Sequence, residues 1–195
     1  MPLRRALPAD AAALAAVHVR SWQAAYRGLV PDTCLDGLDV AERARVWRER
    51  LTAPGAPVVT VVEDEAGAVT AFSSFRAWPA DDEPAGGAGE AEGEGEGGHL
   101  VASVTAELST LYAVPEAWGR GVGRALLAAT VDAMREAGFR EAGLWVFEEN
   151  ARARAFYERA GWHPDGATAT DDTGGRLLTE LRYRVSLFAE SSPTS

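Results

Sequence analysis

The segment that decides the fold is Leu111-Tyr-Ala-Val-Pro-Glu-Ala-Trp-Gly-Arg-Gly-Val-Gly-Arg-Ala-Leu-Leu127. A strand-like apolar run leads into a turn with glycines at 119, 121 and 123, and residues with helical spacing follow. Glycines let backbone N–H groups converge, and the first turn of a helix adds partial positive charge. The segment therefore predicts a strand, a turn and a helix that can bind an anion. On physical grounds alone, a purely structural turn is equally compatible with it.

The rest of the chain alternates between helical and strand patterns. Apolar spacing and capping residues predict helices at 11–23, 40–51, 122–137 and 151–160. Strands are expected at 57–62, 68–75, 100–114, 143–147 and 176–187. In the last of these the residues alternate strictly, which predicts a half-buried strand with Leu177 on the apolar face and Arg182 on the polar face. We expect one domain over residues 2–188.

Residues 79–98 differ from everything around them. Gly, Ala and Glu dominate, and residues 81–97 hold seven acids and no base. Such a composition buries too little apolar surface to offset its ordering entropy, so a disordered acidic loop is predicted here. An inert insertion is the simpler interpretation, and attraction of a cationic substrate is the alternative. The tail at 189–195 is also expected to be disordered.

Composition excludes several classes of protein. The net charge is −10, and all 19 basic residues are Arg, which excludes a Schiff-base lysine and a P-loop lysine. Without residues 81–97 the chain is nearly neutral, so no nucleic-acid partner is expected. The single cysteine, Cys34, allows no intrachain disulfide, and the spacing of three histidines predicts no metal site. No apolar run suggests a signal peptide or a membrane span, and a cytoplasmic location is expected.

Two further features specify the class of protein. Glu107 stands eleven residues before Trp118, and some 30 residues after the glycine turn comes Asn150-Ala-Arg-Ala-Arg-Ala-Phe-Tyr-Glu-Arg-Ala-Gly-Trp162. The chain here resembles the GNAT family of acyl-CoA-dependent N-acetyltransferases, whose motif Q/R-x-x-G-x-G/A is followed by N-x-x-A-x-x-F-Y-x-x-x-G-F. The resemblance covers nearly the whole chain. Trp118 departs from it, because the family has Gln or Arg at this position.

The resemblance implies an α/β (α+β) fold with a mixed, mostly antiparallel sheet of six or seven strands and about four flanking helices. Two central strands would splay apart, and the pantetheine arm of acetyl-CoA would lie between them. The implied activity is direct transfer of an acetyl group from acetyl-CoA to a primary amine of a small molecule or a peptide N-terminus. No metal is required. A non-catalytic acyl-CoA-binding sensor or interaction module is the alternative.

Cofactor contacts implied by the resemblance come from three segments. Strand residues would pair with the pantetheine arm, the turn would hold the pyrophosphate through its N–H groups, and Asn150 with its helix would bind the arm again. The residues are Leu111, Tyr112, Ala113, Val114, Gly119, Arg120, Gly121, Val122, Gly123, Arg124, Ala125, Asn150, Ala153 and Phe156.

Catalysis needs a group that takes the proton of the amine, an N–H that stabilises the oxyanion, and an acid for the leaving thiolate. By motif position the acid is Tyr157, with a packed aromatic as the alternative. Glu107 stands where the family often has its general base, acting directly or through water. A solvated carboxylate, or one paired with Arg182, is the other interpretation. A strand N–H near Val114 would stabilise the oxyanion.

The acceptor side is less well defined by the sequence. The resemblance places Trp22 and Tyr26 on the helices that cover the acceptor pocket in this family, which makes both candidate contacts of the amine. The expected partners are acetyl-CoA and an amine, without nucleic acid or membrane. The sequence leaves the oligomeric state open, and a homodimer is one option because the family often dimerises.

Overall fold

The computed structural model describes residues 1–79 and 104–188. The predicted acidic loop at 79–98, apart from Pro79, and the predicted tail at 189–195 lie outside the described residues, as do residues 100–103 of a predicted strand. Within the described part of the chain, no helix has the length and apolar character needed to cross a membrane.

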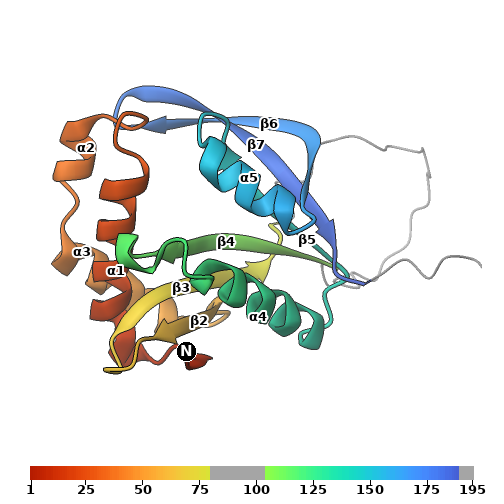
Figure 1. The fold of residues 1–195 in the computed structure, drawn as a ribbon, viewed down its shortest axis with the longest axis horizontal. Helices are drawn as coiled ribbons and strands as arrows, with labels where there is room; N and C mark the ends of the chain where they lie inside the picture. The colour runs from red at the N-terminus through yellow and green to blue at the C-terminus, as the bar shows by residue number, and fades with distance from the viewer. Residues whose placement is uncertain (80–103, 189–195) are drawn as a thin grey trace, which may run out of the picture.

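A seven-stranded sheet forms the centre of the molecule (Figure 1), with the strand order β1-β2-β3-β4-β5-β7-β6. All neighbouring pairs are antiparallel except β4 and β5. The strands are β1 (Leu3–Arg5), β2 (Val58–Glu63), β3 (Val69–Ala77), β4 (Thr105–Ala113), β5 (Glu141–Phe147), β6 (His163–Thr173) and β7 (Arg176–Ser186). The sheet has the mixed, mostly antiparallel arrangement that the resemblance implied.

Helices cover both faces of the sheet. They are α1 (Ala11–Ala25), α2 (Asp32–Asp36), α3 (Val40–Thr52), α4 (Val122–Glu136) and α5 (Ala151–Arg159), with short 3-10 turns η1 (Pro8–Asp10) and η3 (Pro115–Ala117). On one face α3 places Trp47 against Phe72 of β3, and α1 packs beside it. On the other face α4 packs against β2, β3 and β4, and apolar side chains of α4 and α5 share one core cluster with β5 and β7. The two faces thus have separate helical layers.

The central strands β4 and β5 diverge, as the resemblance implied. They pair only through residues 105–107 and 141–143. Beyond this point β4 continues beside β3, and β5 continues beside β7, so the adjoining edges of β4 and β5 have no ladder partner. The parallel pair therefore opens toward the carboxyl ends of both strands.

Two elements and one strand pattern differ from expectation. The sequence analysis did not predict β6 or α2, because β6 is largely exposed and polar and α2 has only five residues. The predicted faces of β7 were wrong at two positions. Leu177 is 70% exposed, because it lies at the hairpin end beyond the reach of α5, while Arg182 is buried. Arg182 is tolerated inside because Asp165 pairs with it at 2.7 Å.

Candidate active site

A cleft of about 1440 Å³ occupies the space between the diverging strands. One wall consists of β4, the glycine turn and the start of α4, and the other of β5 and α5. Side chains from α1, β6 and β7 close one end. The structure brings most of the predicted site residues to this cleft: Trp22, Tyr26, Glu107, Leu111, Tyr112, Ala113, Gly119, Gly121, Gly123, Arg124, Asn150, Ala153, Phe156 and Tyr157.

The glycine turn has the backbone conformation that its sequence suggests. Gly119 and Gly121 have φ values of 72° and 79°, a region that side-chain-bearing residues rarely adopt. The N–H of Ala125 bonds to the carbonyl of Gly121, so the amides of residues 122–124 precede the first bond of α4 and have no acceptor within the helix. These amides, the helix dipole and the cleft-lining Arg124 form a site suited to an anion.

The alternation of hydrogen bonds along β4 shows which groups face the gap. The N–H of Val114 donates to the carbonyl of Thr70 at 2.9 Å, so Val114 bonds toward β3. Because successive residues of a strand bond to opposite sides, Leu111 and Ala113 direct their backbone groups toward β5. The predicted oxyanion donor, a strand N–H near Val114, is therefore not the N–H of Val114 itself, which is already engaged. The N–H groups of Leu111 and Ala113 face the gap instead.

Three other predicted cofactor residues lie outside this cleft. Arg120 and Val122 line a second, smaller hollow together with Val114, and Ala125 lines neither. The backbone amide of Val122 still belongs to the first turn of α4. The side chains of these three residues therefore do not line the main cleft.

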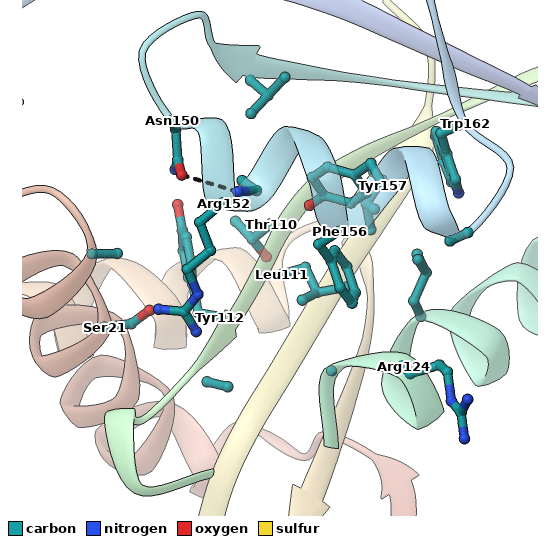
Figure 2. Close-up of a pocket in the computed structure, with 18 of the residues that line it drawn as sticks. Ser21, Thr110, Leu111, Tyr112, Arg124, Asn150, Arg152, Phe156, Tyr157 and Trp162 are labelled. Atoms are coloured by element: carbon teal, nitrogen blue, oxygen red, sulfur yellow. Dashed lines mark hydrogen bonds between the residues drawn. The ribbon is translucent and has the colours of Figure 1, made fainter. Parts of the chain in front are cut away.

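Trp118, where the family has Gln or Arg, contacts both walls of the cleft. Its indole N–H donates to the carbonyl of Ala113 at 2.8 Å, and the guanidinium carbon of Arg152 lies 3.6 Å from the centre of its ring. Arg152 reaches from α5 toward Ser21 of α1 (Figure 2). Among the described residues no carboxylate pairs with Arg152. The sequence analysis did not select Arg152, although it lies within the second motif.

Asn150 organises the start of α5. Its side-chain oxygen accepts a hydrogen bond from the N–H of Ala153 at 3.0 Å, so it is the N-cap of the helix (Figure 2). The Asn150 amide also hydrogen-bonds the hydroxyl of Tyr26, which leaves one of its two N–H groups for a ligand in the cleft. Gly123 of α4 lies close to this helix, and a Cβ there would make an ordinary van der Waals contact with Phe156 at 3.5 Å.

Tyr157 extends from α5 into the cleft, with its hydroxyl on the side of Thr110 and Leu111 (Figure 2). Its ring packs against Phe156 and Trp162, with ring centroids 5.1 and 6.0 Å apart. Burial raises the pKa of Tyr157 above its ordinary value, so the phenol keeps its proton at neutral pH. Among the described residues its hydroxyl has no hydrogen-bond partner, which leaves the proton free for donation.

Glu107 lines the cleft at the closed end of the splay. Arg76, directly opposite on β3, binds its carboxylate at 2.6 Å. The alternative of a pairing with Arg182 was wrong, because Arg182 binds Asp165. The carboxylate of Glu107 is therefore already engaged by a guanidinium within the sheet.

The acceptor end of the cleft is aromatic. Trp22 and Tyr26 of α1 lie with ring centroids 4.8 Å apart, and Tyr26 meets Phe147 of β5 at 5.5 Å. Burial raises the pKa values of Tyr26 and Tyr112, which keeps both phenols neutral. The predicted acceptor contacts Trp22 and Tyr26 thus line the end of the cleft formed by α1 and β5.

Two carboxylates of this end were missed by the sequence analysis. Glu180 of β7 and Asp171 of β6 both line the cleft. Burial raises the pKa of Glu180, and the charge of Asp171 adds to that effect. Strict alternation had assigned Glu180 to a solvated face. The long hairpin to which both residues belong reaches α1 and α2 (Figure 1), and β6 itself was not predicted.

Comparison with known proteins identifies the class. Residues 32–162 match the model of the acetyltransferase (GNAT) family, so the chain belongs to this family. It is an acetyl-CoA-dependent acyltransferase.

Individual relatives are similar in sequence. An uncharacterized N-acetyltransferase of Bacillus subtilis (strain 168), YuaI, is 32% identical over 148 residues, which cover 76% of this chain and 72% of that protein. Mycothiol acetyltransferase of Beutenbergia cavernae is 45% identical over 62 residues, which cover 32% of this chain and 21% of that protein.

Solved structures share the fold. The ribosomal-protein-alanine N-acetyltransferase of Brucella melitensis has a TM-score of 0.68 at 22% identity, covering 95% of this chain and 99% of that one. YncA of Salmonella typhimurium, solved with its cofactor acetyl-CoA, has a TM-score of 0.66 at 22% identity, covering 100% and 98%.

Proposed function

We propose that this enzyme transfers the acetyl group of acetyl-CoA directly to a primary amine of a small molecule or a peptide N-terminus. The observation that carries the proposal is the unpaired edge of β4, which faces a cleft with an anion site at one end and a phenol beside it. Bound acetyl-CoA supplies an activated thioester carbon.

The residues present fit this cosubstrate. Leu111 and Ala113 face the gap with backbone groups that an extended amide-containing arm can pair with, as an added strand would. The carbonyl of Ala113 already accepts the indole N–H of Trp118, so Leu111 offers the unoccupied pair of groups. The first amides of α4 with Arg124 suit the pyrophosphate, and the N–H of Asn150 that does not bind Tyr26 suits a carbonyl of the arm.

The chain's own residues then have distinct tasks. The N–H of Leu111 stabilises negative charge that develops on the thioester oxygen. Tyr157 gives its proton to the departing sulfur, because its buried hydroxyl is neutral and unpaired among the described residues. A carboxylate of the cleft takes the proton of the acceptor ammonium, and Glu107, from the sequence prediction, is one of the carboxylates present.

An amine screen tests this function. Purified protein is mixed with acetyl-CoA and a panel of polyamines, amino acids and short peptides, and the release of free CoA thiol is measured. We expect release that depends on one class of amine, and a thermal shift with acetyl-CoA but not with NAD, since ligand binding stabilises only the folded state. A thermal shift without release for any amine would support the non-catalytic acyl-CoA-binding module instead.

A further inference from the structure

We propose that Glu180 is the carboxylate that binds the ammonium group of the acceptor and takes its proton, and that the acceptor is a primary amine that is cationic at neutral pH. This inference rests on the proposed function. Glu107, the base that the sequence favours, is the competing candidate.

The placement of Glu180 differs from that of every other carboxylate discussed above. It lies on β7 opposite Phe147 of β5, is half-buried, and lines the cleft. Among the described residues it forms no hydrogen bond and no ion pair. By contrast, Arg76 binds Glu107 at 2.6 Å and Arg182 binds Asp165 at 2.7 Å. A half-buried carboxylate without a partner is costly unless something binds it.

The surroundings of Glu180 favour a cation. Tyr26 of α1 and Tyr112 of β4 come close enough to feel its charge, and both are neutral phenols. Asp171 lies diagonally across the β6–β7 ladder on the same face and adds a second negative charge. Aromatic rings and carboxylates together are the groups that bind an ammonium ion. Arg152 lines the same cleft from α5, but no ion pair joins it to Glu180 among the described residues.

The proton transfer balances. The acceptor R–NH3⁺ gives one proton to the carboxylate of Glu180, which becomes a carboxylic acid, and the freed lone pair forms the C–N bond at the thioester carbon. The C–S bond breaks, and the sulfur keeps the electron pair and takes a proton from Tyr157. The nitrogen loses a second proton, which restores the phenol. Glu180 returns its proton to water, so the products are R–NH–acetyl, CoA thiol and one H⁺.

The raised pKa of Glu180 supports this role. Burial disfavours its charged form, and Asp171 disfavours it further. A carboxylate whose pKa lies closer to the working pH is better suited to take a proton. The carboxylate of Glu107, by contrast, is already bound by Arg76.

Matched variants of the two carboxylates test the proposal with the fastest amine of the panel. We expect Glu180→Gln to lower kcat/KM for the amine by ~10²-fold, with a defect that shrinks at high pH, where the amine loses its proton unaided. Glu180→Asp should recover part of the loss. Glu107→Gln should lose less than ~10-fold, and the Kd of acetyl-CoA should stay unchanged in all three variants. If Glu107→Gln shows the larger, pH-dependent defect, Glu107 is the base and the proposal is wrong.

A second variant keeps the test decisive if Glu180→Gln does not fold. Asp171 is exposed, so Asp171→Asn leaves the core intact. Because removing its charge lowers the pKa of Glu180, the acid limb of the kcat/KM profile should move to lower pH. If the acid limb of the kcat/KM profile does not move in Asp171→Asn, the proposal is overturned. Turnover of no amine at all would instead overturn the proposed function.

Discussion

The two sides of the cleft are built in different ways. The cofactor side consists of β4, the glycine turn and the start of α4, which are continuous in sequence, and its functional groups are mainly backbone groups. The acceptor side collects side chains from α1, β5, β6 and β7, which are far apart in the chain. A backbone site tolerates many substitutions as long as the glycines remain. A side-chain site can change its ligand with a single substitution, so we expect the acceptor side to determine specificity.

The largest expected effect is at the glycine turn. Gly121→Glu places a carboxylate where the first amides of α4 would hold phosphate, and like charges brought together cost several kcal/mol. We therefore expect the affinity for acetyl-CoA to fall by at least ~10²-fold in a calorimetric titration.

Gly55→Glu is the matched control for this variant. Gly55 also has a positive φ, 71°, and open space around it, but it lies outside the cleft. Both variants should lose a similar amount of stability, on the order of 1 kcal/mol. Equal loss of acetyl-CoA binding in both would show that backbone strain, and not an anion site, explains the result.

Tyr157 lies between the two sides, and its substitution has the next largest effect. In Tyr157→Phe the ring still packs on Phe156 and Trp162, so the KM of acetyl-CoA should be nearly constant while kcat falls by ~10²-fold. Thermal stability should not change, because the hydroxyl has no partner among the described residues.

Tyr183→Phe provides the comparison. The hydroxyl of Tyr183 donates to Glu158 at 2.8 Å and accepts from Arg154 at 3.2 Å, and the residue is fully buried. Its loss should cost about 1 kcal/mol of stability and leave kcat unchanged. If Tyr157→Phe turns over at the wild-type rate, the side chain of Tyr157 contributes only packing and its hydroxyl is not the acid.

The same contrast explains what the sequence could predict. The strand, turn and helix of the cofactor side follow from local patterns, since glycines, caps and apolar spacing act over a few residues. The engagement of the Val114 N–H depends on the register of β3 beside β4, which no local pattern encodes. Glu180 was missed for a related reason. Its face of β7 looked polar and solvated, and only the packing of α1 and β6 against it makes that face a pocket.

The pH dependence of stability tests whether His18, which packs against Tyr112 of the cleft, is buried in its neutral form. This residue of α1 is 6% exposed and packs against Tyr112 at 4.8 Å, and burial lowers its pKa to about 3. Between pH 6.5 and about 3 the unfolded chain therefore binds a proton that the folded chain does not, so stability decreases as the pH falls. The neutral burial of His18 lowers the free energy of unfolding by at most about 1.4 kcal/mol for each pH unit below 6.5.

Denaturant melts at several pH values measure this effect. His18→Phe keeps an aromatic ring at the same place and should flatten the decrease between pH 6 and 4 by roughly that amount. His163→Phe, at an exposed position, is the control and should keep the wild-type slope. An unchanged slope in His18→Phe would mean that the histidine is not buried in its neutral form.

The smallest effect is expected at Trp118, and it decides whether the cofactor side depends on backbone groups. Trp118→Gln restores the family's residue type and removes both the hydrogen bond to Ala113 and the contact with Arg152. If backbone groups hold acetyl-CoA, its Kd should change by less than about fivefold, the equivalent of one neutral hydrogen bond. Trp118→Phe separates the two contacts, because it keeps an aromatic ring for Arg152 but lacks the N–H. A loss in Trp118→Gln as large as that in Gly121→Glu would show that the indole itself binds the cosubstrate, and that both sides of the cleft depend on side chains.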